Sequence, residues 1–137
     1  MSRIVEKACV YATRARDELL VFERPDADAG VRVPGGTVES DEPHQLAALR
    51  ELEEECGVAG DRATYLGSIR RHHPRRPEIH HRHFFHAPVE ERRDRWDHTV
   101  TGGGDDDGMV FRCYWLPVPA APYALDHGFE ALVHRLR

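Results

Sequence analysis

Seven residues at fixed spacings between Gly36 and Val58 constrain this chain more than any other feature of its sequence. The run reads GTVESDEPHQLAALRELEEECGV, and its fixed positions are Gly36, Glu42, Arg50, Glu51, Glu54, Glu55 and Gly57. Pro43 suits the first turn of a helix, and Gly57 suits the left-handed residue that ends one. We therefore predict a helix over about 43–56, with Asp41 or Glu42 as its cap.

This predicted helix has an apolar side and an acidic side. Successive helical residues are rotated by about 100°, so the carboxylates of Glu51, Glu54 and Glu55 share one side of the helix. The apolar residues lie on nearly the opposite side and are Leu46, Leu49, Leu52 and Cys56. Carboxylates three or four residues apart repel one another and weaken an isolated helix by roughly 0.2–0.5 kcal/mol per pair. A hard divalent cation such as Mg²⁺ would compensate this repulsion. A solvated acidic face is the alternative.

The register resembles the Nudix box at every position, with Leu52 and Val58 in its two aliphatic places. The chain is thereby similar to the Nudix hydrolase superfamily, whose members include MutT-like proteins. The resemblance implies an α+β domain with the Nudix fold, an α/β/α sandwich around a central mixed β-sheet. It also implies a metal-dependent pyrophosphatase that uses Mg²⁺ or Mn²⁺ and cleaves a diphosphate linkage by attack of water on phosphorus.

The same resemblance implies roles for individual residues. Glu51, Glu54 and Glu55 would be metal ligands, with one of them or a downstream acid as general base, and the carbonyl of Gly35 would join the metal shell. Arg50 would orient a glutamate, and Glu42 would be structural or a remote ligand. From the residues themselves, we expect Pro34-Gly35-Gly36 to form a turn in which the glycines allow positive φ and a close approach of backbone to a ligand. A tight strand-to-helix turn without a ligand role is the alternative.

The remaining chain alternates between strands and turns and predicts one domain over 1–137. We expect a hairpin of Lys7–Arg14 and Glu18–Arg24 around a turn at 15–17, then a short strand at Val31–Val33. Further strands are expected at Ala63–Arg71, Ile79–Val89 and Val110–Val118. A C-terminal helix is expected after Asp126, with Phe129, Leu132, Val133 and Leu136 on its apolar side.

Residues 90–109 form a polar stretch too long for a simple connection, which favours a lid-like functional loop or disorder. Its acids Glu90, Glu91, Asp94, Asp97 and Asp105–Asp107 are candidates for a further ligand or base. Trp96 is a candidate for stacking on a nucleobase or for anchoring the loop, and Gly102–Gly104 reads as a hinge.

Charge is distributed unevenly along the chain, which carries a net −5. Residues 70–83 are basic and rich in histidine, so a small anionic substrate fits better than a nucleic-acid duplex. Arg24, Arg70, Arg71 and Trp96 are the candidate substrate contacts, and His72, His73, Arg75 and Arg76 are further candidates for phosphate. Strand alternation places His81 and His83 on one face and His80 and His86 on the other, where a same-face pair could bind a transition metal or make ordinary hydrogen bonds.

The sequence leaves the substrate open. A nucleoside triphosphate or another nucleoside diphosphate derivative is the first choice, with ADP-ribose or a nucleotide sugar as an alternative; Pro74 lies where ADP-ribose hydrolases carry a proline. A nucleotide-binding or regulatory domain without turnover is the other reading. Cys9, Cys56 and Cys113 lack paired spacing, and the chain has no long apolar run, so we expect a cytoplasmic protein without a membrane partner. Family habit suggests a homodimer.

Overall fold

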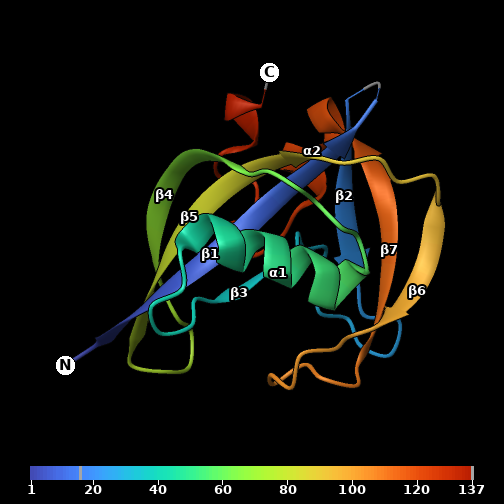
Figure 1. Ribbon diagram of the computed structural model, residues 1–137. Coiled ribbons are helices and arrows are strands. Elements are labelled where there is room, and N and C mark those ends of the chain that lie inside the picture. Colours follow the sequence, from blue (N-terminus) through green and yellow to red (C-terminus); the bar gives the residue numbers. More distant parts are fainter. Residues whose placement is uncertain (16, 137) are drawn as a thin grey trace.

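The computed structural model describes residues 1–15 and 17–136 (Figure 1). In chain order, the elements are β1 (Arg3–Arg14), β2 (Glu18–Glu23), β3 (Gly35–Thr37), α1 (His44–Cys56), β4 (Thr64–His72), β5 (Glu78–Pro88), β6 (Arg95–Thr99), β7 (Val110–Pro117) and α2 (Ala121–Ala124). Two 3₁₀ turns lie at Val118–Ala120 and Val133–Arg135. Of the predicted hairpin turn at 15–17, Arg16 lies outside the described residues.

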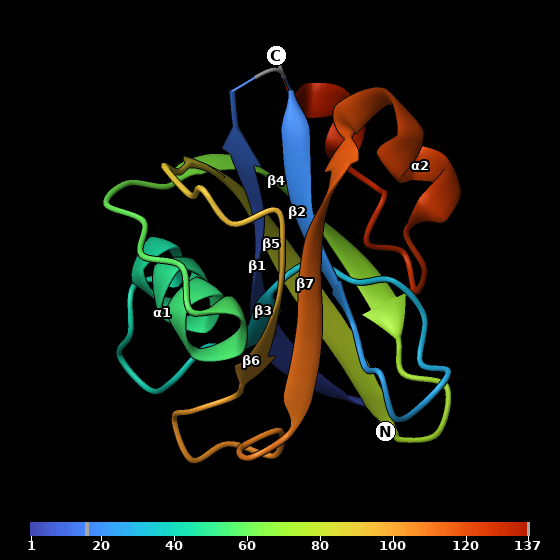
Figure 2. The same ribbon diagram turned by 90° about the vertical axis from the view of Figure 1, so that its right-hand side faces the viewer.

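The strands form one mixed sheet in the order β4-β5-β1-β2-β7-β6, with β3 also paired to β1. β1 and β5 run parallel from Arg3 opposite Glu78 to Thr13 opposite Pro88, and the other pairs are antiparallel. Helix α1 covers one face, and α2 with the C-terminal segment covers the other (Figure 2). This arrangement confirms the predicted α+β sandwich.

Alternation along β1 divides the core into two layers. Ala8, Val10 and Ala12 are fully buried in the layer that packs beneath α1. Cys9 and Tyr11 face the C-terminal segment, where the Tyr11 hydroxyl donates to the carbonyl oxygen of Phe129 at 2.6 Å. Because successive residues of a strand point to opposite faces, this central strand supplies side chains to both sides of the sheet.

The predicted helix after Asp126 is wrong in position and form. The chain instead makes the short α2 before Asp126, then turns, and ends in the 3₁₀ turn at Val133–Arg135. His127 and Gly128 have φ values of 59° and 80°. These left-handed residues interrupt the α-helical path at its start. The expected apolar residues still contribute to the core, with Leu132 and Val133 buried there.

The entry to the box also differs from the prediction. Arg32 forms a single bridge with Phe22 in place of a strand, and the expected turn residues Gly35 and Gly36 form β3. Neither of these glycines has positive φ. Pro43 is the N-cap of α1, without a side-chain cap bond in the described chain, and Gly57 ends the helix at φ 69° as predicted.

The polar stretch 90–109 is partly a strand. β6 lies within it and pairs with β7 along the edge of the sheet. Trp96 on β6 is 9% exposed and donates its indole N–H to the carbonyl oxygen of Cys56 at 2.9 Å. Of its two predicted roles, the structure therefore supports the anchor. Among the described residues, no helix combines the length and the hydropathy needed to cross a membrane.

Candidate active site

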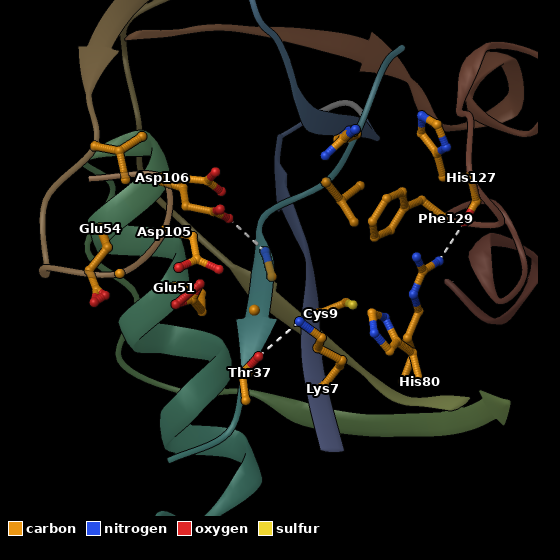
Figure 3. A pocket seen from close by; sticks show the side chains of 18 of the residues that line it. Lys7, Cys9, Thr37, Glu51, Glu54, His80, Asp105, Asp106, His127 and Phe129 are labelled. Atoms are coloured by element: carbon orange, nitrogen blue, oxygen red, sulfur yellow. Dashed lines mark hydrogen bonds between the residues drawn. The ribbon is translucent and has the colours of Figure 1, made fainter. Parts of the chain in front are cut away.

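The box helix forms one wall of a cavity of about 930 Å³. Glu51 and Glu54 on α1 lie on one side with Asp105 and Asp106, and His80 and His127 lie across the cavity (Figure 3). The acids that line the cavity form the acidic wall, which comprises Glu39, Glu51, Glu54, Glu55, Asp105, Asp106 and Asp107. The basic wall comprises Lys7, Arg24, Arg32, Arg71, Arg75, Arg76 and Arg82, with His72, His73, His80 and His127. A ligand with dense negative charge fits between the two walls only if cations shield it from the carboxylates.

Arg50 organises the acidic wall from within α1. Its Nε and Nη2 contact the two carboxylate oxygens of Glu42 at 2.8 and 3.0 Å. Its Nη1 reaches Glu51 at 2.9 Å and Glu54 at 3.0 Å. These contacts raise the pKa of Arg50 further, and the hydrogen bonds from Arg50 lower the pKa of Glu42. Glu42 thus holds the guanidinium of Arg50, and Arg50 in turn contacts Glu51 and Glu54. Of the two roles predicted for Glu42, structural residue or remote ligand, these contacts support the structural one.

Two glycines allow backbone to approach these carboxylates closely. A Cβ on Gly36 would lie 2.2 Å from Oε2 of Glu51, and a Cβ on Gly102 would lie 2.1 Å from Oε1 of Glu54. Real Cβ atoms do not approach oxygen so closely. A Cβ at Gly36 would therefore displace the end of the Glu51 side chain. The positive φ expected at Gly35 and Gly36 is absent, and the close approach to a ligand stays a prediction.

Glu55 differs from the other two acids because it points into the interior. It is 6% exposed, and its Oε1 accepts the backbone N–H of Gly35 at 2.8 Å. Burial raises the pKa of Glu55 well above its ordinary value, and the charge of Glu51 adds to this effect. Burial also raises the pKa of Glu51. The buried side of α1 is Ala47, Ala48, Leu52, Glu55 and Cys56, so the predicted division into apolar and acidic faces is wrong at Glu55 and at Leu46, which is 53% exposed.

The loop between β6 and β7 brings a second set of acids to the cavity. Backbone hydrogen bonds close this loop on itself, from Gly108 N–H to Val100 and from Asp107 N–H to Gly104. Thr101 N–H donates to the carbonyl oxygen of Glu54 at 3.1 Å, which fixes the loop against α1. Asp105, Asp106 and Asp107 consequently line the cavity.

Three other acids of the stretch 90–109 are paired elsewhere. Glu91 pairs with Arg93, Asp94 with Arg14 and Asp97 with Arg112. Glu90 is exposed and is not among the residues that line the cavity. Of the acids predicted as a further metal ligand or general base, only Asp105–Asp107 therefore line the cavity.

The candidate substrate residues separate into two groups. Arg24 and Arg71 line the cavity, whereas Arg70 and Trp96 do not. On β4, Arg71 pairs with His80 and Arg70 pairs with His81, and His80 and His81 point to opposite faces of the sheet. Arg70 therefore lies on the face away from the cavity, which contradicts the substrate contact predicted for Arg70. The buried position of Trp96 likewise contradicts the predicted stacking of Trp96 on a nucleobase.

Sequence reasoning did not single out four residues of the basic wall. Lys7 and Arg82 are partners in the parallel register of β1 and β5 and face the cavity together, and Arg32 and His127 come from loops. The guanidinium of Arg82 lies 4.2 Å from the ring centroid of Phe129 and donates to the carbonyl of His127. If the pairing of β1 with β5 had been known, strand alternation would have placed Lys7 and Arg82 side by side on one face of the sheet.

The donors of the acidic wall suit a hard divalent metal. Glu51, Glu54 and Glu55 offer carboxylate oxygens, and the backbone of Gly35 also lines the cavity, with its N–H 2.8 Å from Glu55. Mg²⁺ and Mn²⁺ prefer such oxygen ligands. The glycine cradles beside Glu51 and Glu54 leave these carboxylates unobstructed by a Cβ. The residues present therefore fit the predicted cofactor.

Comparison with known proteins agrees with this site. The NUDIX domain family matches residues 4–136. Diphosphoinositol polyphosphate phosphohydrolase 3-alpha of Mus musculus is 33% identical over 95 residues, which are 69% of this chain and 56% of that protein. Nudix hydrolase 21, chloroplastic, of Arabidopsis thaliana is 34% identical over 79 residues, 58% of this chain and 40% of that protein. The chain thus spans little more than half the length of the mouse relative.

Solved structures share the fold over nearly the whole chain. A MutT NUDIX hydrolase from Burkholderia pseudomallei has a TM-score of 0.73 at 22% identity, covering 99% of this chain and 100% of its own. The MutT protein from Methanosarcina mazei Go1 has a TM-score of 0.74 at 16% identity, covering 98% and 93%. With the box register, the acidic helix and the family match over 4–136, this chain belongs to the NUDIX domain family.

Proposed function

We propose that this chain is a metal-dependent hydrolase that cleaves a diphosphate linkage in a small, phosphate-rich molecule. The observation that carries the proposal is one cavity lined by the seven carboxylates of the acidic wall and by the seven Lys and Arg side chains of the basic wall. A diphosphate would need both walls, because the bases can bind its oxygens and the acids would hold the divalent cations that shield its charge.

Different residues would hold the metal, orient its ligands and take a proton from the attacking water. Mg²⁺ or Mn²⁺, held by Glu51, Glu54, Glu55 and the carbonyl of Gly35, would neutralise phosphate charge and lower the pKa of a bound water. Arg50 keeps Glu51 and Glu54 in one orientation through the contacts described above. The general base is one of the box glutamates or one of Asp105–Asp107. Positioning and electrostatics, without a covalent intermediate, account for catalysis of this kind.

The basic wall supports a substrate with more phosphate than one diphosphate group. Arg71, Arg75 and Arg76 line the cavity with His72 and His73, in addition to Lys7, Arg24, Arg32 and Arg82. Arginine forks match phosphate oxygens two at a time. The relatives named as diphosphoinositol polyphosphate phosphohydrolases support the same class. A molecule that carries several phosphate groups and at least one diphosphate group is therefore the first substrate class to test.

A nucleoside triphosphate or other nucleoside diphosphate derivative is the second class, and one observation favours it. Phe129 adds apolar surface to the cavity, whereas Phe22 and Val33, which also line it, are only 3% and 1% exposed. Such surface can cover a base or a ribose, although Phe129 already carries the guanidinium of Arg82 over its ring. ADP-ribose and nucleotide sugars belong to this same test.

The experiment is phosphate release with product chromatography, with and without Mg²⁺, on a panel of a diphosphoinositol polyphosphate, nucleoside triphosphates, ADP-ribose, nucleotide sugars and dinucleoside polyphosphates. We expect metal-dependent turnover that falls by at least about 100-fold in kcat for Glu54→Gln, in line with loss of a group that holds or moves charge in the transition state. Glu53→Gln is the matched control, because Glu53 lies next to Glu54 on α1 and is absent from the cavity lining. Binding of a panel member without turnover would support the regulatory alternative and overturn the hydrolase.

A further inference from the structure

A second cluster of polar side chains lies outside the cavity, on the sheet face that α1 covers. Glu6 on β1 pairs with His81 on the parallel strand β5, and His83 follows two residues later on the same face. His44, the first residue of α1, approaches them from above the sheet. We call Glu6, His44, His81 and His83 the histidine cluster. None of the four is among the residues that line the cavity.

The histidines converge on one carboxylate. His83 Nε2 lies 2.7 Å and His44 Nε2 lies 3.4 Å from Oε1 of Glu6, and His81 Nδ1 lies 3.2 Å from Oε2. The ring centroids of His44 and His83 are 4.4 Å apart, and those of His81 and His83 are 4.1 Å apart. Three imidazoles thus gather around one carboxylate, whose two oxygens offer about four acceptor positions.

The outer nitrogens of two of these rings have partners of their own. The hydroxyl of Tyr65 lies 3.3 Å from Nδ1 of His83, and the hydroxyl of Ser68 lies 3.0 Å from Nε2 of His81. Both partners come from β4. Hydrogen bonds to the far ring nitrogen are how metal-binding histidines are commonly oriented. The inner nitrogens of both rings are thereby directed at the carboxylate of Glu6, His83 at Oε1 and His81 at Oε2.

We propose that the histidine cluster is a second metal site, specific for a divalent transition ion such as Zn²⁺. Its ligands are a carboxylate oxygen of Glu6 and ring nitrogens of His44 and His83, with His81 as the fourth. One oxygen and three imidazole nitrogens suit Zn²⁺, Co²⁺ or Ni²⁺ and disfavour Mg²⁺, which takes oxygen ligands.

The side chains must adjust to accept such an ion, because His83 Nε2 and Oε1 of Glu6, now 2.7 Å apart, must separate and His81 must move inward to become the fourth ligand. The ligand atoms of Glu6, His44 and His83 all lie within 4.8 Å of one another. Tetrahedral Zn²⁺ with bonds of 2.0–2.1 Å requires ligand atoms about 3.3 Å apart. The side chains of His44 and Glu6 are 38% and 41% exposed, so they have room to adjust and the ion has a path from solvent. His81 and His83 are 21% and 14% exposed and form the firm side of the site.

The position of the site gives the ion a structural effect. His44 begins α1, and the other three ligands belong to the sheet beneath it. An ion bound here ties the start of the box helix to β1 and β5. Because the ion binds only the folded chain at this site, it raises the melting temperature of the protein. This inference does not depend on the proposed hydrolase function.

The test uses the full chain after removal of metal with a chelator. Zn²⁺ is titrated by calorimetry in excess Mg²⁺, which occupies the oxygen donors of the cavity, and Co²⁺ absorption in the visible region reports the ligands. Variants are His44→Ala, at an accessible first position of the helix, and Glu6→Gln. His134→Gln, at an exposed position near the C-terminus, is the matched control.

We expect one Zn²⁺ per chain, a rise in melting temperature, and Co²⁺ bands of nitrogen coordination. His44→Ala and Glu6→Gln should each weaken Zn²⁺ binding by at least about 10-fold and remove the rise in melting temperature, and His134→Gln should change neither. If the wild-type chain binds no Zn²⁺ in excess Mg²⁺, or if binding persists unchanged in both ligand variants, the site is overturned. The Co²⁺ spectrum of the wild type decides the matter even if a variant does not fold.

Discussion

Arg50 and Glu42 form a two-pronged ion pair, with Nε to Oε2 at 2.8 Å and Nη2 to Oε1 at 3.0 Å, although eight residues separate them. Lysine cannot reproduce this fork while also reaching Glu51 and Glu54. We therefore expect Arg50→Lys to lower kcat by about 10–100-fold through misplacement of the two glutamates. Arg112→Lys is the control, since Arg112 pairs with Asp97 away from the cavity. Equal kcat in the two variants would contradict the positioning role.

Gly36→Ala is expected to disable the site while leaving the fold intact. The new Cβ would fall 2.2 Å from Oε2 of Glu51, so this carboxylate must move, whereas the backbone at Gly36 does not require positive φ. We expect kcat to fall by about 100-fold, as for other small misplacements of catalytic groups. The matched variant is Gly104→Ala, where a Cβ meets no heavy atom within 4 Å in the described chain. Circular dichroism would show whether both variants keep the native fold, and a Gly36→Ala protein with normal kcat would refute the steric argument.

Two neighbouring arginines on β4 should differ in their effect on substrate binding. Arg71→Gln removes a cation from the cavity, while Arg70→Gln removes the same charge from the opposite face of the sheet. A hydrogen bond to a charged group contributes about 1.5–3 kcal/mol, so KM should rise about 10-fold or more in Arg71→Gln. Steady-state kinetics on the preferred substrate would measure both. A similar rise in KM for Arg70→Gln would show that net charge alone controls binding.

Trp96→Phe tests the anchor role against base stacking. The variant loses the hydrogen bond from the indole N–H to the carbonyl oxygen of Cys56 and leaves part of a buried site empty. We expect the free energy of unfolding to fall by about 1–3 kcal/mol, measured by urea denaturation. KM should stay near that of the wild type, because Trp96 is not part of the cavity wall. A large rise in KM with unchanged stability would restore the stacking interpretation.

His86 should make the stability of the protein depend on pH. Burial lowers the pKa of His86, with Arg62 adding to the effect, and its Nε2 lies 2.7 Å from the hydroxyl of Thr13. The unfolded chain then binds a proton more readily than the folded chain, so the contribution of His86 is present above pH of about 6.5 and is lost as pH falls below it. We expect His86→Gln to reduce the fall in melting temperature between neutral and mildly acidic pH. A curve parallel to that of the wild type would exclude this contribution.

Local sequence patterns predicted the parts of the site that lie close together in the chain. Gly57 ends α1 as expected, whereas Pro43 is the N-cap in place of the predicted Asp41 or Glu42. The box spacing places Arg50 beside Glu54 because residues four apart on a helix are neighbours. The buried side of α1 was harder to predict. Contacts from Gly35 draw Glu55 into the interior, and those contacts come from a separate strand.

The predictions that failed depend on longer-range contacts or on single backbone conformations. β6 has one buried apolar residue, Trp96, and exists because β7 offers it an edge. The basic wall depends on the parallel pairing of β1 with β5, which joins residues about 75 positions apart, as in Arg3 with Glu78. The C-terminal helix fails at His127, a non-glycine residue whose left-handed conformation no periodicity reveals.

The alternation of β1 also limits how this chain can change its length. Glu6 belongs to the histidine cluster on one face, and Lys7 faces the cavity on the other. A substitution at either position disturbs one site only. Insertion or deletion of one residue nearby would move each side chain of β1 to the opposite face of the sheet. Glu6 would then lose its contacts with the histidines, and Lys7 would no longer face the cavity. Descendants of this sequence are therefore expected to accumulate point changes along β1 while indels are confined to the connections around it.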